Sequence, residues 1–325
     1  ATPGAHGVLR WHVNRGWDEA PEAIPVHEIA ETNRPAVISR VVQEGGTGEA
    51  IAAAELEKIR LAVELRTGVE TGRQLHLLTI GVSDYGSGAD RLRLDFADDD
   101  ALAVKNALLN DQRSLYERVV PQHLTDDDAT ESNVRGALAD MAELMAAAGD
   151  AARGDLAVVL FSGHGAVLDG EYHLILHGVS DRSEAHLAAA ALPASTLRNA
   201  LSNLPGRVLL LIDACRADAA TGAGDIQHDA DRLREALRAP NVAVLTSSTA
   251  KQASYESESW GDGGAGAFTA VFLDALRHGD SNRNGLISMD ELMRYLQTHV
   301  PLLTSGRQVP QVDVRFGGEL FVTKL

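Results

Sequence analysis

Two residues of this sequence have the chemistry of a nucleophile and its base, Cys215 and His164. Cys215 is the only cysteine among 325 residues, and it follows the apolar run Val208–Ile212 and one acid, Asp213. His164 lies between two glycines shortly after a second apolar run, residues 156–161. The thiolate is the attacking form of a cysteine, and a nearby histidine commonly generates it. The pair therefore predicts a cysteine nucleophile that is activated by His164.

Both apolar runs have the length and composition of central strands in a parallel sheet. Ligands bind outside the carboxyl ends of such strands, so neighbouring strands would bring His164 and Cys215 to one edge. Each residue alone has a simpler explanation, because a lone buried cysteine is usually core filler and Ser162–Gly165 can be only a turn. Together they favour a catalytic dyad, with the backbone N–H groups of Gly165 and Cys215 as candidate oxyanion donors.

Strands and helices alternate along residues 75–325. The expected strands cover residues 75–83, 117–124, 156–161, 172–177, 207–212, 242–246 and 320–322. The expected helices cover residues 98–109, 131–145, 193–204, 231–238, 268–277 and 289–300. The connections are long enough for crossovers, which predicts an α/β fold with a mainly parallel central sheet and helices on both faces.

Local signals refine this scheme. Pro121 interrupts the second strand and predicts a short strand or an edge position. Asp128 followed by Glu131 resembles a capping box at the start of a helix. The apolar stripe behind it would be buried, and its members are Val134, Leu138, Met141, Leu144 and Met145.

Residues 1–74 are expected to form an extension of the domain that begins at residue 75. Prolines and glycines break up residues 1–48, which predicts an irregular arm, and residues 49–65 have the spacing of one amphipathic helix. This extension is interpreted as a possible remnant of a preceding domain.

Composition excludes several classes of protein. The formal net charge of −17, from 29 basic and 46 acidic residues, disfavours nucleic acid and anionic membranes as partners. It favours basic partners, although it is equally typical of a solvated acidic surface. One cysteine excludes an intrachain disulfide framework and a cysteine-based zinc site, and no apolar run approaches a bilayer-spanning length. A cytoplasmic location is expected.

Five segments in a fixed order carry a family resemblance: LLTIGVSDY (77–85), LDFADDDALAVKNALL (94–109), LAVVLFSGHGA (156–166), VLLLIDACRA (208–217) and VAVLTSSTAKQASYE (242–256). With them, residues 75–325 resemble the caspase-like cysteine peptidases, and most closely the bacterial caspase homologues and metacaspases. The resemblance implies a three-layer fold and peptide hydrolysis by His164 and Cys215, with no third catalytic residue and no cofactor. It also implies regulated proteolysis, such as defence or cell-death signalling, with an upstream activating protein or domain.

The resemblance also bears on substrate specificity. Animal caspases hold an aspartate side chain with two arginines, and the corresponding positions here are Leu94 and Ser257, although Arg93 is one residue away. Metacaspases instead bind Arg or Lys with acids, and the matching residues here are Asp100 and Asp213.

By the same resemblance, Asp99, Ser248 and Glu256 complete the expected substrate-binding residues. The resemblance therefore implies cleavage of protein or peptide substrates after Arg, or Lys. The alternatives are an Asp-specific caspase-like peptidase and a catalytically silent caspase-like binding module. A simpler explanation makes Asp100 an acid of a first helical turn and Asp213 a cap at the end of a strand.

Residues 280–291 fit the pattern D-x-[DN]-x-[DN]-G-x5-E of a calcium loop and lie between two expected helices. The ligands would be Asp280, Asn282, Asn284, the carbonyl of Leu286, and Glu291. Against calcium stand the single copy, the presence of only two acids among the ligands, and an arginine inside the loop. A calcium site and a metal-free polar turn both remain open.

Overall fold

The structure, a computed structural model, describes residues 9–12, 16–19, 73–110, 115–181, 183–216, 229–248, 254–261, 263–314, 316 and 320–324. The chain divides into two compact units, Ala1–Val69 and Glu70–Leu325. In the first unit, β1 (Leu9–His12) and β2 (Gly16–Glu19) form an antiparallel hairpin. This hairpin lies in the region for which the sequence predicted only an irregular arm. The helix expected at residues 49–65 lies outside the described residues.

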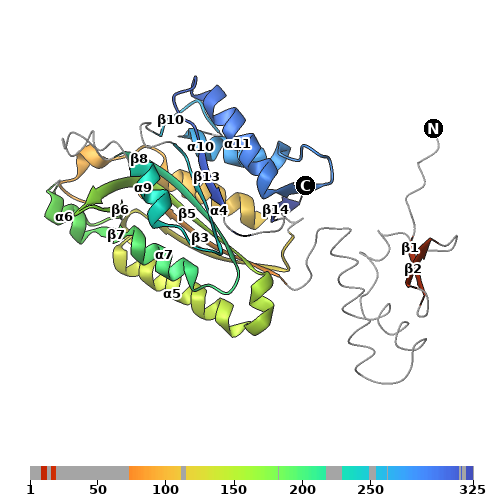
Figure 1. Ribbon diagram of the computed structural model, residues 1–325. Helices are drawn as coiled ribbons and strands as arrows, with labels where there is room; N and C mark the ends of the chain where they lie inside the picture. The colour runs from red at the N-terminus through yellow and green to blue at the C-terminus, as the bar shows by residue number, and fades with distance from the viewer. Residues whose placement is uncertain are drawn as a thin grey trace. The chain divides into compact units, whose positions relative to one another are not determined.

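The second unit is built on an eight-stranded sheet (Figure 1). In spatial order its main strands are β13 (Gln311–Val314), β9 (Val242–Thr246), β8 (Arg207–Arg216), β5 (Leu156–Leu168), β3 (Gln74–Gly81) and β4 (Arg118–Thr125). The strands from β9 to β4 are parallel, and β13 runs antiparallel to β9. Beyond this path, β6 (Glu171–Ile175) pairs antiparallel with β5, and β7 (Ala191–Pro193) pairs with β6. The predicted mainly parallel sheet is confirmed.

Helices cover both faces of the sheet, which makes three layers (Figure 1). One layer holds α4 (Ala97–Asn110), α10 (Ala267–His278) and α11 (Met289–Leu303). The other holds α5 (Glu131–Ala147), α7 (Ala194–Ser202) and α9 (Asp229–Ala236), with the short α6 (Glu184–Ala189) beside β7. Because both faces are covered, the central strands are continuously apolar: Leu209, Leu210 and Leu211 have no exposed surface.

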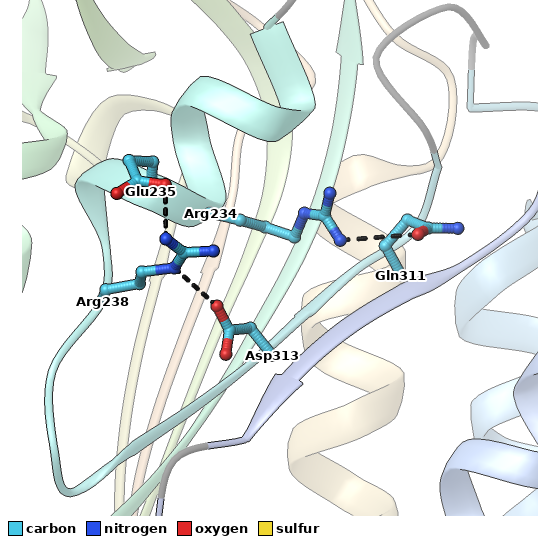
Figure 2. A network of polar contacts seen from close by, with 5 residues as sticks. All are labelled: Arg234, Glu235, Arg238, Gln311 and Asp313. Atoms are coloured by element: carbon cyan, nitrogen blue, oxygen red, sulfur yellow. Dashed lines mark hydrogen bonds and ion pairs between the residues drawn. The ribbon is translucent and has the colours of Figure 1, made fainter.

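The two edges of the sheet differ in how well the sequence predicts them. β4 forms one edge with Pro121 exposed within it, as expected, although the strand has eight residues and is not short. β13 forms the other edge and was not predicted. Arg238 of the α9 region contacts Glu235 and donates to Asp313 of β13 at 2.8 Å, and Arg234 reaches Gln311 at 3.4 Å (Figure 2). These contacts attach the helix to the edge strand.

Three local predictions need correction. α5 is capped by Thr130, whose hydroxyl accepts the Asn133 N–H at 3.3 Å, so Asp128 is not its N-cap. Leu144 is 48% exposed, and Ala137 is buried instead. The last strand, β14 (Phe321–Lys324), does not join the main sheet but pairs with β12 (Leu286–Ser288). Among the described helices, none has the length and apolar character needed to span a membrane.

Candidate active site

The two central strands β5 and β8 bring His164 and Cys215 together. Their parallel ladder runs without a shift from Leu156 opposite Arg207 to Gly165 opposite Arg216, and it places His164 opposite Cys215. Neighbouring strands lie about 4.8 Å apart, so the two residues are next to each other at the carboxyl end of the sheet. Both lie inside strands, because β5 continues to Leu168 and does not end at Phe161 as predicted. The structure describes the backbone of Cys215.

The imidazole of His164 is oriented by a backbone carbonyl. The side chain is 7% exposed, and its Nε2 lies 2.8 Å from the carbonyl oxygen of Leu92, in the short helix η1 (Asp90–Leu92). A carbonyl can only accept a hydrogen bond, so Nε2 carries the proton and the lone pair of the neutral ring is on Nδ1. The sequence did not predict this contact, because a backbone carbonyl has no signature in residue type.

The glycines beside His164 have a steric basis. A Cβ atom at Gly165 would fall 1.8 Å from the Tyr172 hydroxyl oxygen, and one at Gly163 would fall 2.9 Å from the Tyr85 hydroxyl oxygen. Neither site has room for a side chain without displacement of a tyrosine. The predicted oxyanion donors, the N–H groups of Gly165 and Cys215, lie at the same end of the sheet, and their role stays a prediction.

Two buried carboxyl groups lie next to this pair of strands. Asp213 is in β8, and Asp100 is in the first turn of α4. Gly266 of β11 (Ala265–Gly266) packs against both: a Cβ atom there would lie 2.6 Å from Asp100 Oδ2 and 3.0 Å from Asp213 Oδ2. Because both distances are measured from the same Cβ position, the two oxygens are at most about 5.6 Å apart. The Gly266 N–H donates to both oxygens of Asp100, at 3.1 and 3.2 Å.

The acid pair has no positive partner within the described part of the chain, where no Lys or Arg forms an ion pair with Asp100 or Asp213. Burial raises the pKa of Asp100 well above its ordinary value, and repulsion from Asp213 adds to the shift, while the Gly266 hydrogen bond opposes it. Burial also raises the pKa of Asp213. Its Oδ1 is buried and lacks a hydrogen-bond partner among the described residues.

Serine hydroxyls reach the other side of Asp213. Ser247 and Ser254 hydrogen-bond to its carboxylate and lower its pKa, against the larger effect of burial. The two hydroxyl oxygens also lie 2.6 Å from each other. The sequence singled out Ser248 instead. Ser248 is buried, and its carbonyl accepts the Thr246 hydroxyl at 3.2 Å.

A third acid, Glu256 of β10 (Glu256–Ser257), is part of the same cluster. Burial raises its pKa, and repulsion from Asp95 and Asp213 contributes, while its carboxylate accepts the Asp95 N–H at 3.2 Å. Asp99, by contrast, is exposed, because consecutive helix residues point in different directions. The structure thus brings Asp100, Asp213 and Glu256 together and leaves Asp99 outside the cluster.

Comparison with known proteins identifies the family. Residues 75–321 match the caspase domain family. This chain belongs to the caspase-domain family. No curated protein matches the sequence.

Solved structures with a similar fold share little sequence with this caspase domain. A protein from Geobacter sulfurreducens is 16% identical with a TM-score of 0.48, over 75% of this chain and 94% of its own. Pro-sf-caspase-1 is 14% identical with a TM-score of 0.49, over 76% of this chain and 89% of its own. The Drosophila initiator caspase Dronc is 10% identical with a TM-score of 0.43, over 75% of this chain and 80% of its own.

The predicted calcium loop of the caspase domain is closed by its own hydrogen bonds. Both carboxylate oxygens of Glu291 accept them, one from the N–H and hydroxyl of Ser281 and the N–H of Asn282, the other from the N–H and hydroxyl of Ser288. Asp280 accepts the N–H groups of Asn284 and Gly285.

Backbone N–H groups and serine hydroxyls therefore donate to the carboxylate oxygens that a calcium ion would need. Burial alone would raise the pKa of Glu291, but the hydrogen bonds from Ser288, Ser281 and Asn282 together lower it. This arrangement favours the metal-free polar turn over the calcium site. Within the described residues there is also no cluster of three or more His, Cys, Asp or Glu side chains able to hold a metal.

Proposed function

We propose that this caspase domain is a cysteine endopeptidase that cleaves peptide bonds after Arg and, less efficiently, after Lys. One observation carries the proposal: β8 holds both Asp213 and Cys215, two residues apart, while β5 places Ser162 and His164 opposite them. Alternate residues of a strand share a face of the sheet and lie about 6.6 Å apart along it. The acid pair is therefore adjacent to the nucleophile on one face, within reach of a long basic side chain of the substrate.

The chemistry of the acid pair supports a basic residue before the scissile bond. Asp100 and Asp213 are buried close together without a cation, which is unfavourable for both charged forms. A guanidinium supplies several N–H donors in a planar array and can bind more than one carboxylate oxygen. A lysine supplies a single ammonium, so weaker recognition is expected. An aspartate would add another negative charge and is disfavoured.

The proposed reaction proceeds through a thioester. The sulfur of Cys215 forms a bond to the substrate carbonyl carbon while its proton passes to Nδ1 of His164. The carbon–nitrogen bond then breaks, and His164 returns that proton to the leaving amine. Water next attacks the thioester and gives a proton to His164, which delivers it to the departing sulfur. The Leu92 carbonyl accepts the Nε2–H throughout and stabilises the imidazolium that forms twice.

Peptides that differ only in the residue before the scissile bond test this proposal. We expect kcat/KM to fall in the order Arg, Lys, Gln and Asp, with no hydrolysis by Cys215→Ala or His164→Ala. Efficient cleavage after Asp would contradict the assignment of the acid pair. Hydrolysis that survives in Cys215→Ala would contradict the nucleophile.

The biological setting stays a prediction that rests on the family resemblance. It comprises regulated proteolysis in defence or cell-death signalling, protein substrates with exposed basic residues, an upstream activating protein or domain, and a cytoplasmic location. The strong negative charge is consistent with basic protein substrates and with the absence of nucleic-acid and membrane partners.

A further inference from the structure

The backbone of His164 occupies a gap in the hydrogen bonding of β5. On one side, the pairing of β5 with β3 ends at Ser162, which lies opposite Gly81 and also accepts the Val82 N–H at 3.0 Å. The pairing of β5 with β6 begins only at Gly165. Between these ladders the N–H of His164 donates to the hydroxyl oxygen of Tyr85, at 2.7 Å. The Tyr85 side chain thus takes the place of a neighbouring strand as the hydrogen-bond partner of His164, the proposed base.

Tyr85 also contacts the imidazole. The two rings are stacked, with centroids 5.1 Å apart and planes at 29°. Tyr85 is itself firmly held: it is 1% exposed, and its carbonyl accepts the N–H groups of Gly178 and Val179 at 3.1 and 2.8 Å. One buried residue therefore contacts both the main chain and the ring of His164.

We propose that Tyr85 is a positioning residue for the reaction, an inference that rests on the proposed function. Its hydroxyl fixes the main chain of His164, and its ring restricts rotation of the imidazole. Together with the Leu92 carbonyl, which accepts the Nε2–H, this keeps Nδ1 available for proton transfer with Cys215. Supporting residues of this kind matter because a small displacement of a reacting group can cost a large factor in rate.

Substitutions at Tyr85 separate its two contacts. Tyr85→Phe keeps the stacked ring and removes the hydrogen-bond acceptor, whereas Tyr85→Leu removes both. We expect kcat to fall on the order of tenfold in Tyr85→Phe and further in Tyr85→Leu, with KM unchanged, because the base is misplaced and substrate binding is not. Gly163→Ala offers a second route, since its Cβ would lie 2.9 Å from both the Tyr85 hydroxyl and the Phe161 ring, and it should lower kcat as Tyr85→Phe does.

The lone thiol of the chain provides a readout that does not need peptide hydrolysis. Alkylation of Cys215 by iodoacetamide follows the thiolate, so an oriented His164 lowers the pH of half-maximal rate. We expect this pH to rise in Tyr85→Phe and to rise most in His164→Ala. Thr79→Val is the matched control, because it removes the hydrogen bond between the buried Thr79 hydroxyl and His123, at 2.7 Å. Thr79 lies opposite Leu160, four strand positions before His164.

Three results of these measurements can be told apart. A lower kcat and a higher alkylation pH in Tyr85→Phe and Gly163→Ala, with wild-type values in Thr79→Val, support the positioning role. If Tyr85→Phe and Thr79→Val lose stability alike and keep wild-type values for kcat and alkylation pH, the role is overturned while the dyad stands. If His164→Ala itself alkylates like the wild type, the proposed dyad fails and the inference on Tyr85 fails with it.

Discussion

The acids that define the proposed specificity are unfavourable for the stability of the fold. Asp100 and Asp213 are 3% and 4% exposed, and their pKa values are raised by burial. A carboxyl group whose pKa is raised in the folded state stabilises the protein below its unfolded pKa, and that contribution is lost as the pH rises through the folded value. At neutral pH the pair therefore lowers the stability of the domain. Buried carboxyl groups without a cation are expected where a ligand supplies the positive charge.

Asp213→Asn is predicted to separate stability from function. Loss of one buried carboxylate should lower kcat/KM for an Arg peptide on the order of a hundredfold or more, because the substrate cation loses a desolvated partner. At pH 8 the same variant should be more stable than the wild type, by on the order of 1–4 kcal/mol, and the difference should shrink as the pH falls towards 4. Peptide kinetics and thermal unfolding measure the two effects. Asp99→Asn is the matched control, since Asp99 is exposed, and a similar effect there would argue against a specific role of Asp213.

At the scale of the elements, the short strand β11 brings a residue from a distant part of the sequence between the two acids. Gly266 has φ −64° and ψ 143°, which any residue can adopt, so its backbone does not require glycine. The limited space does require glycine, because a Cβ atom would lie 2.6 and 3.0 Å from carboxylate oxygens. The absence of a side chain at Gly266 therefore lets β11 pack directly against both carboxyl groups.

Gly266→Ala is therefore predicted to displace the two acids and to leave the dyad intact. Activity towards an Arg peptide should fall at least tenfold through a higher KM, because one methyl group displaces the acids that bind the substrate. The rate of Cys215 alkylation should stay at the wild-type value. Equal loss of both would show that the substitution disturbs the whole site.

The loop from Asp280 to Glu291 is predicted to act as a structural turn at the start of α11. Glu291 forms a capping box with Ser288 and is 3% exposed, so Glu291→Gln should lower the free energy of unfolding by on the order of 2–3 kcal/mol. Millimolar calcium should leave the melting temperature of the wild type unchanged. A rise with calcium that disappears in Glu291→Gln would restore the calcium site.

The sequence predicts those elements whose signal is local. The buried strands β3, β5, β8 and β9 are apolar runs, and their order along the chain already indicates a parallel sheet. β13 escapes prediction because its sequence, QVDV, alternates polar and apolar residues over only four positions. The Ser162–Gly165 segment resembles a turn but is strand, because β6 folds back and pairs with its end.

The candidate site shows the same division. His164, Cys215, Asp100 and Asp213 are identifiable by residue type and family pattern. The Leu92 carbonyl and the Tyr85 hydroxyl are not, because a main-chain contact or a single tyrosine acquires meaning only when the fold brings it to His164. Gly266 is likewise inconspicuous until its distance to both carboxylates is known.

At the scale of the whole molecule, the match to the caspase domain family lies within the second compact unit. It spans residues 75–321, and that unit spans Glu70–Leu325, with its own sheet and helices on both faces. All residues proposed for the reaction lie in this unit. The net charge of −17 belongs to the full chain and should raise the rate at which basic substrates arrive.

An unbiased map of cleavage sites tests the proposed specificity and the proposed nucleophile together. A library of peptides from a digested proteome, treated with the full chain and read by mass spectrometry, reports every residue that precedes a cut. We expect new termini after Arg, then Lys, and none with Cys215→Ala. Termini mainly after Asp, or the same termini with Cys215→Ala, would contradict this expectation.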